Sequence, residues 1–251
     1  MLEFVKTADG SNTIYNSQVG ENYHSRNGAL QESKHVFINS GLLYFLDNKS
    51  VQPLEKGNTH SLPSKQVEAD GLSGAIDHIS ILEVGFGTGL NFLLSADVCT
   101  DRNISLYYTG IEAFPLSKEM IYETGYNEYI SPGIWQKFND EYEKSLLSSV
   151  ILNPYCKLQI ADCKLLDFQS EKQYDILYFD AFAVARQPEM WDEAAIAHTI
   201  KFLKPGGVFV TYAITGNLKR ALKTLNCKIE KAPGAAGKRE MLRAVKLSNY
   251  N

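Results

Sequence analysis

Residues 79–91 read Ile-Ser-Ile-Leu-Glu-Val-Gly-Phe-Gly-Thr-Gly-Leu-Asn, and this stretch carries the clearest fold signal in the chain. An apolar β-like run ends in an acidic residue, three glycines follow at alternate positions, and a helical pattern begins directly after them. This order predicts a strand, a tight backbone turn and the first turn of a helix. Because glycines leave the main chain uncovered, a nucleotide-like ligand can lie against such a turn.

The glycine spacing favours one class of cofactor. Dinucleotide-binding turns follow the pattern G-x-G-x-x-G, whereas position 90 here is Leu. Glu83 followed by a G-x-G-x-G turn fits S-adenosylmethionine better than NAD, so an NAD-dependent enzyme is the weaker alternative. A purely structural strand–helix turn is a further alternative. We expect the following residues of this stretch to bind the cofactor: Glu83, Gly85, Phe86, Gly87, Thr88, Gly89 and Asn91.

The composition is that of an ordinary globular protein. The chain has 251 residues, of which 44% are hydrophobic and 22% are charged, enough for one sizeable α/β domain. No apolar run approaches the ~18 residues of a membrane span, and the first residues lack a secretory signal pattern. The four cysteines are scattered and form no C-x-x-C pair, which favours reduced thiols and indicates no metal site. We therefore expect a cytoplasmic protein that contacts no membrane.

Apolar β-like runs alternate with helical or loop segments along most of the chain. Continuous apolar runs such as 176–179 predict strands covered on both faces, and the alternation with helices predicts a mostly parallel, doubly wound sheet. The last two candidate strands flank a Pro-Gly-Ala-Ala-Gly stretch and predict a closing antiparallel hairpin. The predicted fold class is therefore α/β and Rossmann-like, with seven strands at 79–84, 106–111, 157–160, 174–180, 208–213, 227–231 and 240–246.

We expect a single domain over residues 1–251. Residues 1–46 would cover the substrate and the cofactor, and residues 47–75, rich in Asn, Ser, Pro, Gly, Lys and Glu, are predicted to be a loop insertion. Residues 76–251 would form the Rossmann-like core. Within this core, residues 113–156 form an insertion rich in aromatic residues, whose helical spacing is more typical of a core than of a binding surface.

Acidic residues end four of the predicted strands. In open α/β sheets, ligands bind beyond the carboxyl ends of the strands, so these acids are expected to face one site. Glu83 could hold an ammonium group directly or through water, and Glu112 could accept hydrogen bonds from both hydroxyls of a ribose. Asp162 could accept a hydrogen bond from the amino group of adenine. Asp180, at the end of the fourth strand, completes the expected set of cofactor-binding residues.

Charge is distributed unevenly along the chain. The net charge is −4, yet residues 216–251 carry nine basic and two acidic residues, a net charge of +7 that leaves −11 on the remainder. Such asymmetry can attract a polyanion to one face of a protein. On charge alone, a solvated basic surface is an equally good interpretation.

Four blocks, in the family's order, resemble the MnmC-type methyltransferases, which modify the wobble uridine of certain tRNAs. Residues 179–191 (Phe-Asp-Ala-Phe-Ala-Val-Ala-Arg-Gln-Pro-Glu-Met-Trp) are similar to the family's D-G-F-A-P-x-K-N-P-x-M-W signature. Residues 23–37, 83–92 and 237–242 resemble its N-terminal block, its cofactor motif and its C-terminal G-x-K-R-E-M-L block. The resemblance implies the class I S-adenosylmethionine-dependent methyltransferase fold.

The resemblance also implies a reaction. In this family, a 5-aminomethyl group on wobble 2-thiouridine takes one methyl group from S-adenosyl-L-methionine, giving 5-methylaminomethyl-2-thiouridine in the anticodon region of tRNA. In bifunctional members, a FAD-dependent oxidase domain produces the free amine. This chain stops at Asn251, so we expect the stand-alone methyltransferase form, with no FAD and no metal. A separate oxidase or other enzyme would then supply the aminomethyl precursor.

Asp180 is the expected catalytic residue, since a carboxylate facing the methyl donor and the amine can orient that amine and take its proton. Phe182, Pro188 and Trp191 are expected to wall the substrate pocket or stack on a splayed-out base, although packing explains Trp191 equally well. Basic side chains are expected to contact tRNA phosphates, namely Lys219, Arg220, Lys238 and Arg239. The N-terminal block adds three expected substrate-binding residues, Tyr23, Ser25 and Arg26.

Two other interpretations stay open. A class I methyltransferase of a small-molecule or protein amine would keep every cofactor-binding residue and differ only in its acceptor. A non-catalytic module that binds tRNA or a nucleotide would keep the fold and lack the activity. The departures from the family signature, at Ala181, Val184 and Arg186-Gln187, lie beside the expected methyl-transfer site and therefore concern the acceptor.

Overall fold

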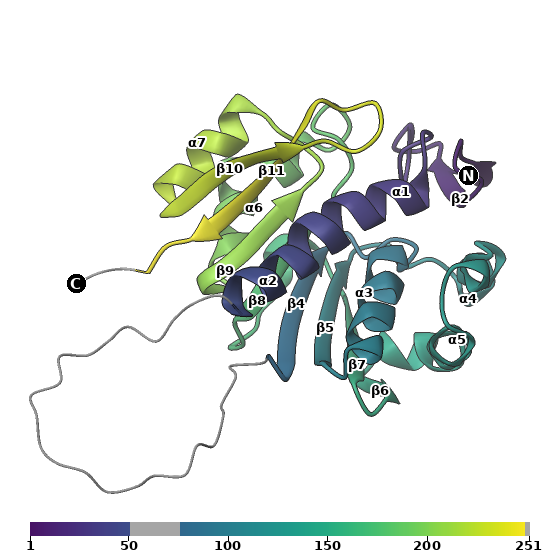
Figure 1. Cartoon of the computed structure of the whole chain (residues 1–251). Coiled ribbons are helices and arrows are strands. Elements are labelled where there is room, and N and C mark those ends of the chain that lie inside the picture. Colours follow the sequence, from purple (N-terminus) through teal and green to yellow (C-terminus); the bar gives the residue numbers. More distant parts are fainter. Residues whose placement is uncertain (51–75, 249–251) are drawn as a thin grey trace, which may run out of the picture.

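The computed structural model describes residues 1–50 and 76–248 and is built around an eight-stranded sheet (Figure 1). The strand order is β10-β11-β9-β8-β4-β5-β7-β6, and the five strands from β9 to β7 run parallel. β11 pairs antiparallel with β9 and β10, and β6 pairs antiparallel with β7. The strands are β4 (His78–Val84), β5 (Ser105–Glu112), β6 (Val150–Asn153), β7 (Cys156–Asp162), β8 (Tyr174–Phe179), β9 (Leu203–Thr211), β10 (Cys227–Pro233) and β11 (Glu240–Lys246).

Helices cover both faces of this sheet (Figure 1). The first face carries the uninterrupted helical run of α1 (Ala29–Ser33), the π-helical η1 (Lys34–Leu43) and α2 (Tyr44–Ser50), followed by α3 (Leu90–Asp101) and α5 (Pro132–Ser145). The second face carries α6 (Glu193–Ile200) and α7 (Gly216–Thr224). The shorter helical segments are α4 (Lys118–Glu123), η2 (Tyr126–Glu128), η3 (Leu165–Asp167) and η4 (Pro188–Trp191).

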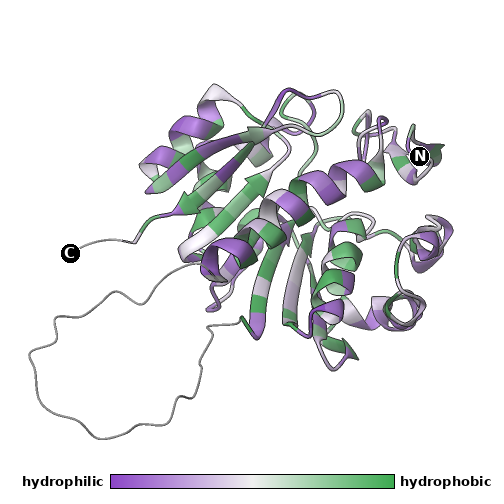
Figure 2. Cartoon of the chain, viewed as in Figure 1, coloured by the Kyte–Doolittle hydropathy of each residue, from purple (hydrophilic) through white to green (hydrophobic). Residues whose placement is uncertain are grey.

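The sheet separates two hydrophobic cores because neighbouring residues of a strand point to opposite faces. Tyr178 of β8 enters the first core, where its ring lies 5.1 Å from that of Phe37 in η1. The next residue, Phe179, enters the second core, where its ring lies 5.0 Å from that of Trp191. Figure 2 shows hydrophobic residues concentrated on the central strands and α3, whereas α7 is largely hydrophilic on its visible side. The continuous apolar runs of the central strands follow from this burial on both faces.

A second, three-stranded antiparallel sheet lies near the N-terminus (Figure 1). It consists of β1 (Leu2–Lys6), β2 (Asn12–Asn16) and β3 (Glu21–Asn22). The sequence does not indicate these strands, because their short runs mix polar and apolar residues without a sustained alternation. Ile14 is nevertheless fully buried and joins the first core, so this small sheet packs onto the main body.

The class I Rossmann-like fold is confirmed, with two differences from the predicted outline. The main sheet has eight strands rather than seven, because the predicted insertion 113–156 contributes the edge strand β6 as well as helices. Tyr142 and Phe138 of this insertion are buried in the first core, as their spacing predicts. Of the predicted loop insertion 47–75, residues 47–50 continue α2, and residues 51–75 lie outside the described part of the chain.

Within residues 1–50 and 76–248, none of the helices combines the length and the apolar character needed to cross a membrane.

Candidate active site

The glycine turn between β4 and α3 has the conformation expected of its sequence. Gly85, Gly87 and Gly89 have φ values of +84°, +53° and +78°, in the left-handed region that favours glycine. A Cβ at Gly85 would lie 2.5 Å from the backbone oxygen of Asp180, so the end of β8 approaches the turn only because Gly85 has no side chain. Gly85 N donates to Ile111 O at 3.0 Å, which holds the turn at the carboxyl edge of the sheet.

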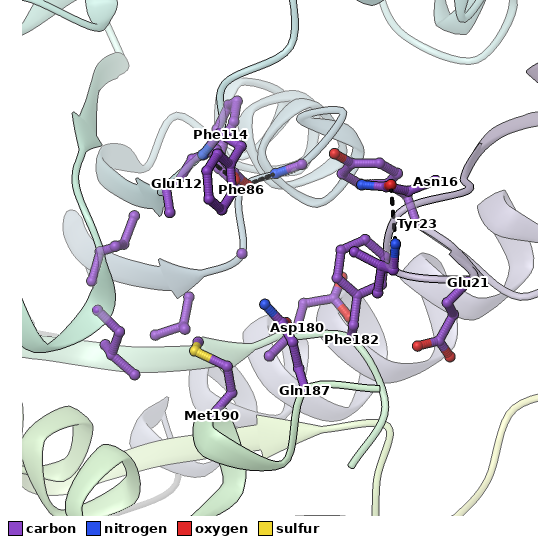
Figure 3. A pocket seen from close by; sticks show the side chains of 18 of the residues that line it. Asn16, Glu21, Tyr23, Phe86, Glu112, Phe114, Asp180, Phe182, Gln187 and Met190 are labelled. Carbon is purple, nitrogen blue, oxygen red and sulfur yellow. Dashed lines mark hydrogen bonds between the residues drawn. The ribbon is translucent and has the colours of Figure 1, made fainter. Parts of the chain in front are cut away.

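A cavity of about 910 Å³ opens beside this turn, within the size range of small-molecule and cofactor sites. Its walls come from the N-terminal segment, the glycine turn, the residues that follow β5 and β7, and the loop after β8. In Figure 3, Glu112 and Phe86 lie at one end, while Tyr23 and Phe182 lie together at the other, with Asp180 beside Phe182. The cavity therefore has a turn-facing end and an end covered by the N-terminal segment.

Glu112, the last residue of β5, fixes the turn-facing end of the cavity. Its Oε2 accepts a hydrogen bond from Gly87 N at 2.9 Å, and its Oε1 accepts one from Phe114 N at 3.0 Å. Burial raises the pKa of Glu112, while these backbone donors oppose the shift. A carboxylate can accept about four hydrogen bonds, so Glu112 retains acceptor capacity for the hydroxyls of a ligand.

Glu83, at the penultimate position of β4, lies behind the cavity wall and does not line it. Asn91 Nδ2 donates to Glu83 Oε1 at 2.8 Å, and Tyr108 OH donates to Glu83 Oε2 at 2.7 Å. Burial raises the pKa of Glu83 well above its ordinary value, and the nearby Asp180 adds to the shift. Glu83 is therefore placed to anchor Asn91, and its predicted role in holding an ammonium group, directly or through water, stays a prediction.

Asp180 follows β8 and is the carboxylate at the floor of the cavity. Its Oδ2 accepts a hydrogen bond from Asn91 Nδ2 at 2.8 Å. Burial raises the pKa of Asp180 to about 8, the negative charge of Glu32 adds to the shift, and Asn91 and Lys238 oppose it. A carboxyl group with such a pKa changes its protonation state near neutral pH, as an acid–base catalyst must.

Glu32 and Lys238 meet at the cavity wall from distant parts of the chain. Lys238 Nζ lies 2.6 Å from Glu32 Oε1 and 4.0 Å from the centroid of the Tyr212 ring. The other oxygen of Glu32 accepts a hydrogen bond from Ser25 N at 2.8 Å. Tyr212 OH donates to Ala181 O at 2.9 Å, next to Asp180. An ammonium group is thus held here between a carboxylate and an aromatic face, an arrangement that suits cations.

The N-terminal segment closes the same end of the cavity through Tyr23 and Glu21. The rings of Tyr23 and Phe182 lie edge to face, with centroids 5.1 Å apart. Glu21 Oε2 accepts a hydrogen bond from Ala183 N at 2.8 Å, which ties β3 to the loop after β8. Together with Glu32 and Asp180, Glu21 makes this end of the cavity rich in carboxylates.

Comparison with known proteins agrees with this geometry. Residues 131–247 match the model of a family described as S-adenosyl-L-methionine-dependent methyltransferase. The chain is similar to two tRNA 5-methylaminomethyl-2-thiouridine biosynthesis bifunctional proteins MnmC. The one from Methylobacillus flagellatus is 27% identical over 244 residues, which cover 91% of this chain and 33% of that protein. The one from Leptospira borgpetersenii is 28% identical over 239 residues, which cover 91% and 32%.

The chain is similar to an MnmC-type methyltransferase domain. It is therefore an enzyme of the S-adenosyl-L-methionine-dependent class, and it spans about a third of the length of the curated relatives that it matches. The crystal structure of MNMC2 from Aquifex aeolicus shares its fold, with a TM-score of 0.71 at 19% identity over all of this chain and 73% of that chain.

The MnmC-like domain brings eleven of the predicted site residues to the cavity wall. Those from the predicted cofactor-binding set are Gly85, Phe86, Gly87, Thr88, Glu112 and Asp180. Those from the predicted substrate-binding set are Tyr23, Ser25, Arg26, Phe182 and Lys238. Residues from the first and the last sixth of the chain thus meet at one cavity.

Nine predicted residues do not line the cavity, namely Glu83, Gly89, Asn91, Asp162, Pro188, Trp191, Lys219, Arg220 and Arg239. Lys219 and Arg220 lie on α7, and their predicted contacts with tRNA phosphates stay predictions. Gly89 precedes α3 as its left-handed N-cap, and Asn91 holds Asp180 from behind. Asp162 is exposed at the end of β7, beside Glu112 in the register of the sheet, and its contact with adenine stays a prediction.

The MnmC-like domain places Trp191 in the second core rather than on the cavity wall. Trp191 is 6% exposed, and its Nε1 donates to Phe182 O at 2.7 Å. Packing therefore accounts for the position of Trp191, and its contact with a substrate stays a prediction. Pro188 is exposed at the start of η4, outside the cavity, and Arg239 is exposed in the β10–β11 connection.

Three residues outside the predicted site also shape the cavity, namely Glu21, Glu32 and Tyr212. Glu21 precedes the N-terminal block and carries no motif that indicates its role. Glu32 belongs to that block, so the resemblance contained its signal. Tyr212 directly follows β9, so the rule that ligands bind beyond strand carboxyl ends would have found it.

In the described part of the chain, no group of three or more His, Cys, Asp or Glu side chains is arranged to hold a metal ion.

Proposed function

We propose that this chain methylates the 5-aminomethyl group of wobble 2-thiouridine in tRNA, using S-adenosyl-L-methionine and giving 5-methylaminomethyl-2-thiouridine. The observation that carries the proposal is the carboxylate-rich end of the cavity, where Asp180 lies beside the acidic residues of the N-terminal segment. Support for the acceptor comes from the relatives, whose names refer to the biosynthesis of this tRNA nucleoside.

The turn-facing end of the cavity fits S-adenosyl-L-methionine. The Tyr23 ring packs directly against Gly87, where a Cβ would lie 2.9 Å from Tyr23 Cδ1, so the N-terminal segment reaches the glycine turn itself. Glu112 lines the cavity and retains acceptor capacity for the ribose hydroxyls. Asp180 and its carboxylate neighbours suit the positive charges of this cofactor. When bound, S-adenosyl-L-methionine supplies an electrophilic methyl group, and the acceptor nitrogen must present a lone pair.

The residues at the other end of the cavity can prepare that nitrogen. A primary amine has a reference pKa of about 10.4 and is mostly protonated at neutral pH. The carboxylates of Glu21 and Asp180 attract such an ammonium ion, whereas Glu32 is already paired with Lys238. Asp180, with a pKa of about 8, is the group best matched to accept the proton of the amine. A cation bound next to Asp180 lowers the pKa of Asp180 and favours its carboxylate form, which is the form that can accept a proton.

The residues that cover the cavity suit a nucleobase that is flipped out of the base stack. We propose that residues 1–46 cover the bound ligands and that Tyr23 and Phe182 pack against the uracil ring. Ser25 and Arg26 line the same end and supply polar groups for the acceptor nucleotide. Wrapping by this segment excludes water, which strengthens the electrostatic interactions of the carboxylates with the amine.

We also propose the setting of the reaction. The tRNA binds through its anticodon region, in the cytoplasm, and a separate oxidase or another enzyme supplies the aminomethyl precursor. Transfer of a methyl group to an amine requires a lone pair, an electrophile and a proton acceptor, so the proposed reaction uses neither FAD nor a metal ion. Residues 1–251 act as a single methyltransferase domain.

The test is nucleoside mass spectrometry of tRNA from cells that lack this gene. The proposal predicts that the 5-aminomethyl nucleoside accumulates and the 5-methylaminomethyl nucleoside disappears, and that the wild-type gene restores the normal pattern. An unchanged nucleoside profile would contradict the tRNA acceptor and would favour a small-molecule or protein amine instead.

A further inference from the structure

A second, shallower hollow lies between α7 and the edge strand β10, outside the cavity described above. This α7–β10 groove has a volume of about 530 Å³. It is lined by Gly216, Lys219, Arg220, Lys223, Ile229 and Lys231. Four of these six residues are basic and none is acidic. Lys231 pairs with Glu240 at 3.3 Å, so the positive charge offered to an anionic partner comes from Lys219, Arg220 and Lys223.

The amphipathic character of α7 directs its basic residues outward. Leu218, Ala221 and Leu222 are buried in the second core, which leaves the opposite side of the helix to solvent. Lys219 and Lys223 are four residues apart and thus neighbours on the helix surface. Figure 2 shows the visible side of α7 as largely hydrophilic.

Several other basic residues of the C-terminal segment, unlike those of α7, are held by partners within the fold. Arg243 pairs with Glu230 at 3.0 Å, and Lys246 donates to backbone carbonyl oxygens. In contrast, Lys219, Arg220 and Lys223 form no salt bridge with a residue of the described ranges 1–50 and 76–248. Their charges are therefore not neutralised by the fold and are available to an outside partner.

Residues that line the groove follow, within a few positions in the sequence, a residue that lines the cavity. Tyr212 lines the cavity, Thr215 caps α7 by accepting a hydrogen bond from Leu218 N at 3.1 Å, and Gly216 already lines the groove. Residues of both sites, Tyr212 and Gly216, follow the carboxyl end of β9. A polymer that places one unit in the cavity can therefore extend across the N-terminal part of α7.

We infer that the α7–β10 groove binds the sugar–phosphate backbone of the tRNA whose wobble base enters the cavity. This inference rests on the proposed function for its choice of partner. Lysine and arginine contacts to phosphates release condensed counterions, so they supply affinity that does not depend on base sequence and weakens with salt. An acidic protein is the alternative occupant. If it were the true partner, changes in the groove would leave the binding of tRNA unaffected.

The experiment compares two triple variants of the whole chain. The test variant carries Lys219→Gln, Arg220→Gln and Lys223→Gln. The control carries Arg102→Gln, Lys157→Gln and Lys172→Gln, which are exposed basic residues at the opposite, amino edge of the sheet. Binding of labelled tRNA with S-adenosylhomocysteine present is measured at several salt concentrations, and thermal unfolding checks that both variants fold.

In the test variant, we expect the affinity for tRNA to fall roughly tenfold or more. The negative slope of the log association constant against log salt concentration should become shallower by about 2 to 3. The control should match wild type in both. A test variant that folds and binds tRNA with wild-type affinity and slope would overturn the inference. Because binding is measured directly, failure of wild type to methylate the tRNA would count against the proposed function alone, and the salt slopes would still decide the role of the groove.

Discussion

Asn91 Nδ2 donates a hydrogen bond of 2.8 Å to Asp180 Oδ2 and thereby fixes the carboxylate at the floor of the cavity. The same nitrogen donates to Glu83 Oε1 at 2.8 Å, so one buried amide joins the carboxyl ends of β4 and β8. Two acidic groups this close repel each other. The hydrogen bonds that Asn91 donates to both offset this repulsion at the carboxyl edge of the sheet.

The first prediction concerns this amide. Asn91→Ala removes the donor shared by Glu83 and Asp180 and leaves buried acceptors without it, so the free energy of unfolding should fall by about 3 kcal/mol. The rate of methyl transfer should fall as well, because Asp180 loses its orientation. Urea denaturation and steady-state kinetics on the same preparation measure the two effects.

The matched control is Asn139→Ala. Asn139 is another buried asparagine on a helix, and its Nδ2 donates to Trp135 O at 2.9 Å, away from the cavity. This variant should also lose stability but should retain wild-type turnover. If Asn91→Ala and Asn139→Ala behaved alike in kinetics, Asn91 would have a structural role only.

The second prediction concerns stability against pH. The pKa of Asp180 is about 8 in the folded protein and near 3.9 in an unfolded chain, so the folded state binds the proton more tightly. The stability that depends on this group is fully present below about pH 4 and is lost as the pH rises through 8. Relative to Asp180→Asn, the wild type should therefore become progressively less stable between pH 5 and 9. Denaturation midpoints of both proteins across this range test it, and parallel pH curves would show that Asp180 is not perturbed.

Much of the site could be predicted from local sequence. The strand ends at Glu112 and Asp180 and the glycine turn are encoded in contiguous stretches, so hydrophobic pattern and spacing indicate them directly. The meeting of Glu32 with Lys238 could not be predicted from spacing, because it joins residues 206 positions apart and depends on how η1 crosses the sheet. Trp191 shows a further limit, since pattern alone does not distinguish an aromatic residue of a core from one of a pocket wall.

The third prediction concerns Lys238. Its positive charge lowers the pKa of Asp180, and it also neutralises Glu32. Lys238→Met should therefore raise the pKa of Asp180 and shift the acidic limb of the pH profile of kcat/KM to higher pH. Lys238→Arg keeps the charge and should restore the limb. A purely structural role would lower activity without this shift.

The control for Lys238 is its neighbour. Arg239→Gln removes a positive charge from the same β10–β11 connection but outside the cavity. It should leave the pH of the acidic limb unchanged, whatever its effect on the KM for tRNA. Equal shifts in both variants would mean that overall charge, and not contact at the cavity, sets the profile.

The fourth prediction concerns the cofactor. Glu112→Gln replaces a carboxylate oxygen that accepts from Gly87 N or Phe114 N with an amide NH₂ and removes the charged acceptor expected for the ribose hydroxyls. A hydrogen bond to a charged group contributes about 1.5–3 kcal/mol, so affinity for S-adenosyl-L-methionine should fall roughly tenfold to a hundredfold. Titration calorimetry measures it. Asp77→Asn, at the exposed amino edge of β4, serves as the control and should bind normally. Unchanged affinity in Glu112→Gln would remove Glu112 from the cofactor site.

The most direct measurement is methyl transfer by the purified protein to tRNA that carries the 5-aminomethyl group, with the products identified by nucleoside mass spectrometry. We expect wild type to form the 5-methylaminomethyl nucleoside and Asp180→Asn to bind the methyl donor while its rate falls by about 10² to 10⁴. Wild-type protein that leaves this tRNA unmodified, or Asp180→Asn protein that methylates it at the wild-type rate, would contradict the account.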